Sequence, residues 1–109
     1  MSNFKTETVN SVTEWAENTF GMATLERQFE RAYEEMRELD KVIYSQRGSY
    51  EKIAEEAADV VICLYRIIGL LHPDAIEEKM AINRARKWNV DQQGCGQHKK
   101  ESEPCSNLD

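Results

Sequence analysis

Two long stretches with apolar residues at helical spacing, separated by one short turn, constrain the fold of this chain most. The first covers about residues 24–45 and the second about residues 50–71, and in both the apolar side chains recur every three or four positions. Between them, the segment "SQRGSY" contains residues typical of a turn. Gly48 is suited to a left-handed helix end, and Ser49 is suited to cap the next helix. The sequence therefore predicts a helical hairpin.

Two shorter segments extend the helical prediction to both sides of the hairpin. Residues 9–19 carry apolar side chains on one side and stop at Gly21. After a chain-breaking proline, Asp74 followed three residues later by Glu77 fits a capping box for a fourth helix, which ends near Trp88. Strand-like alternation is absent, so we predict an all-α fold with a four-helix bundle-like protomer.

Length and composition predict one domain followed by a tail. With 109 residues the chain has room for one modest core. We assign residues 1–89 to the helical domain and residues 90–109, which are polar and contain glycine and proline, to a flexible C-terminal tail. In the second long helix Ala58, Ile62 and Tyr65 lie away from the main apolar stripe. A helix that is apolar on two sides needs a second partner, so we expect a homo-oligomer.

The charge balance and the cysteines exclude several classes of protein. The formal net charge of −6 argues against a nucleic-acid-coating protein, which would carry a basic stripe. No apolar run approaches the ~20 residues of a membrane span, and the N-terminus lacks the apolar stretch of a signal peptide, so we expect a cytoplasmic location. Cys63, Cys95 and Cys105 form no disulfide framework. A tail site made of Cys95, His98 and Cys105 lacks the paired spacing of structural zinc and is not favoured.

Each helix of the predicted hairpin carries an i, i+3 pair of carboxylates beside its apolar stripe. Glu35 and Glu38 form the first pair, and Glu56 and Asp59 form the second. At ~100° per residue, these side chains flank the stripes, whereas the glutamates directly before Glu35 and Glu56 fall on the far sides. Glu38 and Glu56 are equally far in sequence from the middle of the turn, and so are Glu35 and Asp59. Antiparallel helices would therefore bring all four carboxylates to one cleft.

Four carboxylates in one cleft would repel one another and lose hydration. A hard divalent cation with oxygen ligands removes this problem, and Mg²⁺ or Mn²⁺ suits such a site. The alternative, that each carboxylate is only solvated, is the usual one for a single acidic residue on a helix. The matched spacing on both helices favours the metal site.

The fourth helix and the first helix add groups that suit a nucleotide. Lys79, Asn83 and Arg86 are spaced i, i+4 and i+7, so they share one face of the predicted fourth helix. Such a face near bound metal ions would hold the phosphates of a polyphosphate ester. Trp15 and Phe20 are candidates to stack on the base. The alternatives stay open, since the cations can be ordinary surface charges and the aromatic rings can be core residues.

These motifs together resemble a known family. The stretches "EEMRE", "EEAAD" and "KMAINRARKW", in this order and spacing, are similar to those of the MazG-like nucleoside triphosphate pyrophosphohydrolases. The first segment, "WAENTFG", resembles the N-terminal stretch of phage-associated relatives. The resemblance covers about residues 12–89. It implies an all-α enzyme that converts a nucleoside triphosphate to the monophosphate and pyrophosphate, and that assembles as a dimer or tetramer with sites near subunit contacts.

The resemblance also implies roles for the residues singled out above. It implies Mg²⁺ ligands at Glu35, Glu38, Glu56 and Asp59, and phosphate contacts at Lys79, Asn83 and Arg86. Because relatives of the phage type act on purine deoxynucleotides, we expect dGTP or dATP as the substrate. Water would attack the α-phosphorus, and Glu38, with Glu35 beside it, is the candidate catalytic carboxylate that orients this water. The alternative function is a non-catalytic helical adaptor or regulatory module, which would not be stabilised by metal and nucleotide.

Overall fold

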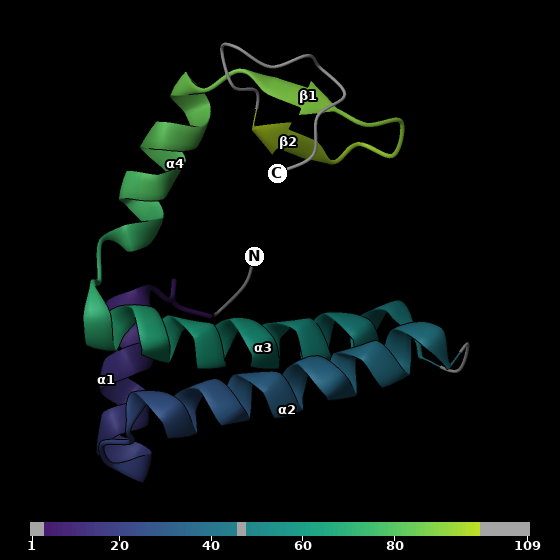
Figure 1. Cartoon of the computed structure of the whole chain (residues 1–109). Helices are drawn as coiled ribbons and strands as arrows, with labels where there is room; N and C mark the ends of the chain where they lie inside the picture. Colours follow the sequence, from purple (N-terminus) through teal and green to yellow (C-terminus); the bar gives the residue numbers. More distant parts are fainter. Residues whose placement is uncertain (1–3, 46–47, 99–109) are drawn as a thin grey trace. The chain divides into compact units, whose positions relative to one another are not determined.

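The chain folds into helices that agree closely with the predicted ones (Figure 1). A computed structural model describes residues 4–45 and 48–98, and the chain divides into two compact units, Met1–Pro73 and Asp74–Asp109. The helices of the first unit are α1 (Val9–Phe20), α2 (Leu25–Tyr44) and α3 (Tyr50–Leu71).

The predicted helical hairpin is formed by α2 and α3, which lie antiparallel and side by side (Figure 1). Ser49 caps α3 as expected, because its side chain accepts a hydrogen bond from the backbone N–H of Lys52. Gly48 does not take the predicted left-handed conformation. Glycine is needed there for space instead, since a Cβ atom would lie 2.7 Å from the carbonyl oxygen of Val42.

The first helix, α1, ends as predicted at Gly21 and packs across α3 (Figure 1). Gly21 has φ 84°, a backbone conformation that favours glycine. At the crossing, Thr13 donates a hydrogen bond from Oγ1 to the carbonyl oxygen of Tyr65, 3.3 Å away. Gly69 allows this close approach, because a Cβ atom there would lie 2.8 Å from the Cβ atom of Thr13.

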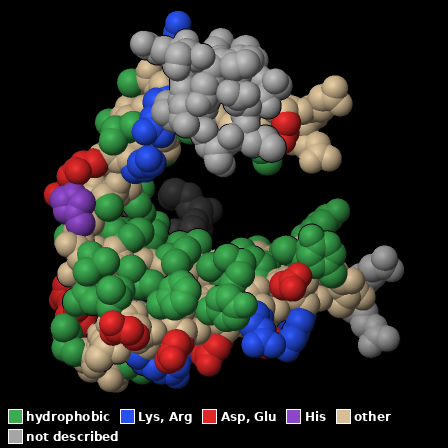
Figure 2. Space-filling view, viewed as in Figure 1, with side chains coloured by type: hydrophobic (Ala, Val, Ile, Leu, Met, Phe, Trp, Pro, Cys, Tyr) green, Lys and Arg blue, Asp and Glu red, His purple; other side chains and the backbone are tan. Residues whose placement is uncertain are grey.

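The first unit buries few side chains on its own. The buried apolar residues among those described are Val9, Ala16, Ala32 and Val60. Figure 2 shows hydrophobic side chains gathered in a broad band over α3, with charged side chains along α2. Large apolar side chains therefore stay exposed on both helices of the hairpin. On α2 they include Phe29, Tyr33 and Met36, and on α3 they include Val61, Ile62 and Leu64.

An apolar groove of about 630 Å³ lies between α1 and α3. It is lined on α3 by Ala58, Ile62 and Tyr65, the residues that the sequence placed on a second apolar side of this helix. Val12 and Trp15 of α1 form part of the opposite wall. The second apolar side of α3 is therefore confirmed, and a single chain covers it only in part.

The second unit begins with α4 (Ala75–Ala85), which ends before the predicted Trp88. The indole N–H of Trp88 donates to the carbonyl oxygen of Asn83 at 2.8 Å, and the N–H of Arg86 also points to this oxygen. Arg86 has an extended backbone (ψ 156°), so the helix ends there, and the indole takes the place of the next helical N–H donor at this carbonyl. Asp74 is the N-cap residue, but the predicted capping box is wrong because its side chain makes no capping hydrogen bond.

A short hairpin of β1 (Trp88–Val90) and β2 (Gly96–His98) follows α4, where the sequence predicted no strand. Its turn is held by Asp91, whose Oδ1 accepts hydrogen bonds from the backbone N–H groups of Gln93 and Cys95 at 2.8 and 2.9 Å. Gly94 supplies the positive φ of 87° that this turn needs. The remainder of the predicted tail, residues 99–109, lies outside the described residues.

The all-α prediction with four helices is confirmed for the described part of the chain, with this hairpin as an addition. No helix described here has the length and apolarity needed to cross a membrane.

Candidate functional site

Three carboxylates from the two helices of the hairpin meet in one place. Glu35 of α2 and Glu56 and Asp59 of α3 each offer an oxygen atom, and these oxygens lie within 4.8 Å of one another. The side chains of Glu35 and Glu56 are only 15% and 14% exposed, and Asp59 is exposed. We call this group the acidic cluster.

Helical geometry explains why these carboxylates meet and their neighbours do not. Glu56 and Asp59 are three residues apart, so they project from the same side of α3. The antiparallel α2 brings Glu35 to their level. Glu34 and Glu55 directly precede members of the cluster and are exposed, as the sequence predicted.

Two cations on the same helices partly neutralise the acidic cluster. Arg31 donates a hydrogen bond to Glu35 at 2.6 Å and another to Glu34 at 2.9 Å, and Lys52 lies 3.0 Å from Glu56. The hydrogen bond with Glu34, together with that to Glu35, raises the pKa of Arg31. The hydrogen bond with Glu56 raises the pKa of Lys52. Both cations therefore stay charged beside the cluster.

The acidic cluster has the donor set of a hard divalent cation. All three side chains offer carboxylate oxygens, which are the ligands that Mg²⁺ and Mn²⁺ prefer. Three negative charges face two cations, and two of the carboxylates are largely withdrawn from water. A divalent ion would correct this excess of negative charge, so the residues fit such a group.

Glu38, the fourth predicted ligand, lies outside this cluster. It is exposed, and its carboxylate lies 3.3 Å from Lys41 on the same helix. Three residues separate it from Glu35, so it lies one turn further along α2. The structure therefore brings together three of the four predicted carboxylates.

Cys63 lies one turn after Asp59 on α3 and is half-buried. Burial raises the pKa of its thiol, and Arg31 and Glu35 act on it in opposite directions. The thiol is therefore mostly protonated at neutral pH, which agrees with a structural role for this cysteine.

Trp15 and Phe20, the predicted base-stacking residues, lie together at one end of the first unit. Their ring centroids are 5.4 Å apart and their planes are nearly perpendicular. They are 54% and 66% exposed, so their rings are accessible rather than part of the core of this chain. The guanidinium group of Arg66 lies 5.8 Å from the ring centroid of Phe20 and donates to the carbonyl oxygen of Gly21.

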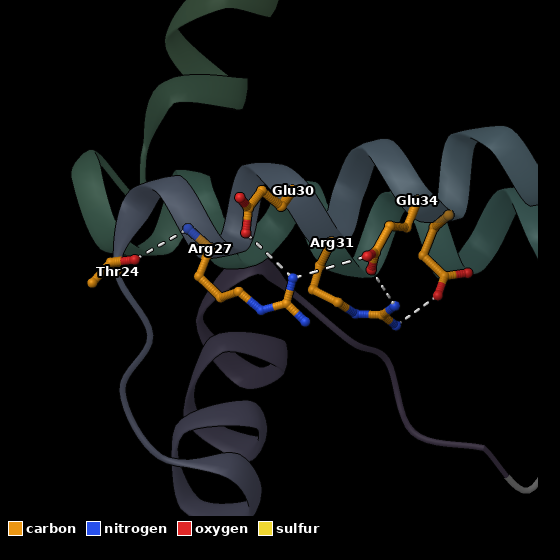
Figure 3. Close-up of polar contacts among 6 residues, drawn as sticks. Thr24, Arg27, Glu30, Arg31 and Glu34 are labelled. Atoms are coloured by element: carbon orange, nitrogen blue, oxygen red, sulfur yellow. Dashed lines mark hydrogen bonds and ion pairs between the residues drawn. The ribbon is translucent and has the colours of Figure 1, made fainter.

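A cleft of about 310 Å³ connects this aromatic pair with arginine side chains of α2 and α3. Arg27, Arg31 and Arg66 line it, and Arg31 also binds Glu35 of the acidic cluster. Figure 3 shows Arg27 and Arg31 side by side along α2, in contact with Glu30 and Glu34. The sequence analysis did not single out these arginines. The four-residue spacing of Arg27, Arg31 and Glu35 on one helix face is the sequence signal that would have identified them.

The predicted phosphate-binding residues lie in the second unit. Lys79 and Asn83 are on α4, but Arg86 follows the end of this helix and has an extended backbone. Lys79 and Asn83 therefore lie on the helix as predicted, and Arg86 is its C-cap residue, with its N–H still bonded to the carbonyl oxygen of Ile82. The side-chain oxygen of Asn83 is buried without a hydrogen-bond partner among the described residues. Their approach to a substrate stays a prediction.

The tail site that the sequence disfavoured is described only in part. Cys95 is exposed and forms no disulfide with a described residue, and Cys105 lies outside the described residues.

Comparison with known proteins finds a structural relative. No protein-family model and no curated protein matches the chain. A solved structure is similar, that of a cyanophage S-2L MazG-like pyrophosphohydrolase bound to dGDP and three catalytic Mn²⁺ ions per active site. The two chains share 29% sequence identity with a TM-score of 0.62, and the similarity covers 87% of this chain and 100% of that one.

Proposed function

We propose that this chain, which resembles a MazG-like pyrophosphohydrolase in its fold and at 29% sequence identity, is a metal-dependent nucleoside triphosphate pyrophosphohydrolase. It would convert a purine deoxynucleoside triphosphate, dGTP or dATP, to the monophosphate and pyrophosphate, in the cytoplasm. The observation that supports this proposal is the acidic cluster, in which carboxylate oxygens of Glu35, Glu56 and Asp59 lie within 4.8 Å of one another.

The residues of the helical hairpin have two separate roles in this proposal, metal binding and orientation of the attacking water. Glu35, Glu56 and Asp59 would hold Mg²⁺ or Mn²⁺, which when bound would neutralise phosphate charge and lower the pKa of a water molecule. Glu38, one turn further along α2 and exposed, is the carboxylate available to orient the attacking water or accept its proton. Water would attack the α-phosphorus, and pyrophosphate would leave.

The cleft beside the acidic cluster supplies the remaining contacts. Arg31 binds Glu35 and lines the cleft, so a phosphate held by its guanidinium group would lie next to the cluster. Arg27 and Arg66 add positive charge along the same cleft. Trp15 and Phe20 form its aromatic end, where a base would stack. Contacts from Lys79, Asn83 and Arg86 to the phosphates remain part of the proposal.

We also propose that the chain acts as a homo-oligomer, a dimer or a tetramer. The apolar groove between α1 and α3 and the exposed apolar side chains of α2 are supporting observations. A second copy would remove this apolar surface from water. Light scattering during size-exclusion chromatography would measure the mass, and a monomer at micromolar concentration would contradict this part of the proposal.

The test of the enzyme compares two neighbouring glutamates. Glu56→Gln removes a member of the acidic cluster, whereas Glu55→Gln removes an exposed carboxylate on the other side of α3. We expect Glu56→Gln to release pyrophosphate about a hundredfold more slowly or worse, because loss of groups that support a bound metal costs about 10- to 100-fold. Glu55→Gln should stay within about twofold of the parent. Equal activity of both variants would reject the assignment of the metal ligands.

The second candidate is a non-catalytic helical adaptor or regulatory module, and the large exposed apolar surface is the observation that favours it. An adaptor would release no pyrophosphate from any of the eight common nucleoside triphosphates. Its melting temperature would also not respond to Mn²⁺ with nucleotide.

A further inference from the structure

Gln28 on α2 has a buried side-chain amide, and its oxygen atom makes no hydrogen bond with a described residue. The residue is 7% exposed, and its Nε2 atom donates a hydrogen bond to the carbonyl oxygen of Ala23 at 3.0 Å. Its Oε1 atom is buried and has no hydrogen-bond donor among the described residues. A buried acceptor without a donor is costly and uncommon in folded proteins, so this oxygen calls for a partner.

The orientation of the Gln28 amide is set by its one hydrogen bond. If the amide were reversed, its oxygen would face the carbonyl oxygen of Ala23, and two acceptors would repel each other. The group without a partner is therefore an acceptor, and it needs an N–H or O–H donor.

Gln28 lines the cleft that holds the aromatic pair and the arginines. Trp15 and Phe20 border this cleft together with Gln28, and its volume of about 310 Å³ is in the range of small-molecule sites. Arg31, also in the lining, joins the cleft to the acidic cluster through its hydrogen bond to Glu35. Aromatic rings that suit the face of a base thus lie in the same cleft as the side chain that carries the buried acceptor.

We propose that Oε1 of Gln28 accepts a hydrogen bond from the exocyclic amino group of the purine base, and that Gln28 thereby selects the substrate. This inference rests on the proposed function and names the feature of the base that is read. A purine without that amino group would leave the buried oxygen without its donor, and the site would reject it. A buried water molecule is the other occupant that could satisfy Oε1, and the test separates the two.

The test compares bases that differ only in one amino group. dGTP is paired with deoxyinosine triphosphate, which lacks the 2-amino group, and dATP is paired with the deoxytriphosphate of unsubstituted purine, which lacks the 6-amino group. For at least one pair, we expect the parent protein to show a kcat/KM about 10- to 100-fold higher for the amino-bearing substrate. In Gln28→Met, this ratio should fall to within about threefold of unity.

The ratio of the kcat/KM values within a pair separates recognition of the base by Gln28 from a structural role of Gln28. A variant that is only less well folded lowers kcat/KM for both members of a pair alike and keeps their ratio. A retained ratio in Gln28→Met, or a parent protein without preference in either pair, would overturn the inference. If Gln28→Met fails to fold, as judged by its circular dichroism, a parent protein without preference in either pair still overturns the inference.

A binding measurement keeps this inference distinct from the proposed function. If no triphosphate is hydrolysed, the proposed function fails, but calorimetry with the corresponding deoxynucleoside monophosphates still tests Gln28. Preferential binding of dGMP over deoxyinosine monophosphate, or of dAMP over the monophosphate of unsubstituted purine, lost in Gln28→Met, would support base reading. Equal binding within both pairs, or no binding at all, would overturn it.

Discussion

Replacing Glu56 by glutamine removes one negative charge from the acidic cluster and tests it without any substrate. In the absence of a cation, Glu56 repels Glu35 and Asp59, and its ion pair with exposed Lys52 offsets part of this repulsion. We therefore expect Glu56→Gln to melt at a higher temperature than the parent when metal is removed. We also expect the variant to lose most of the stabilisation that Mn²⁺ gives the parent.

The size of the effect follows from the separation of the carboxylate oxygens. At 4.8 Å, the largest separation among these oxygens, two unit charges repel each other by about 0.9 kcal/mol in a water-like dielectric and by about 3.5 kcal/mol at an effective dielectric constant of about 20. Because Asp59 is exposed, solvent screens its repulsion of Glu56. We therefore use the lower repulsion energy for both the Glu56–Asp59 pair and the Glu56–Glu35 pair. The gain is then about 1 to 2 kcal/mol. For a domain of this size, each kcal/mol shifts the melting temperature by about 4–8 °C.

The assay is a thermal melt in excess chelator, followed by a Mn²⁺ titration. A single site that binds only the folded chain stabilises the parent by about 2.7 kcal/mol at a hundred times its Kd. Glu55→Gln is the matched control and should respond to Mn²⁺ as the parent does, since this exposed residue lies outside the cluster. A Glu56→Gln variant that melts below the parent in chelator, or that keeps the full Mn²⁺ response, would refute the reasoning.

Three further predictions concern the fold. Gly69→Ala should lower the free energy of unfolding by about 1–3 kcal/mol in urea titrations, because the new Cβ atom would meet Thr13; an unchanged midpoint would contradict the tight crossing of α1 and α3. Thr24→Ala should cost about 1 kcal/mol in the same assay, since the Thr24 hydroxyl caps α2 (Figure 3). Cys63 should react with iodoacetamide more slowly than exposed Cys95 at neutral pH, because burial raises the pKa of its thiol; equal rates by mass spectrometry would disprove this.

The parts of the site that depend on helix geometry alone could be predicted from the sequence. Helical periodicity and one short turn predicted that Glu35, Glu56 and Asp59 come together, and the structure brings them together, although Glu38, predicted with them, lies outside the cluster. The same period also placed Glu34 and Glu55 on the outer sides. The predicted MazG-like resemblance is confirmed by the cyanophage structure.

The arginine-lined cleft could not be predicted in the same way, because it forms where α1 packs against the hairpin. Phe29 is one of the apolar side chains that recur along α2, but it is exposed, whereas Gln28 beside it is buried. Periodicity identifies an apolar side but not which part of it faces the same chain. The β-hairpin was missed because its strands are too short to show a period, and its turn depends on the side chain of Asp91.

The small set of buried apolar residues in the first unit has a consequence for how this protein holds its shape. Val9, Ala16, Ala32 and Val60 have small side chains, so their burial alone contributes little hydrophobic free energy. If contact with another copy supplies the rest, folding and assembly are one equilibrium. The fraction of folded chains would then depend on how dilute the protein is, and a sample that is stable at micromolar concentration would lose its structure, and its chemistry with it, when diluted far enough.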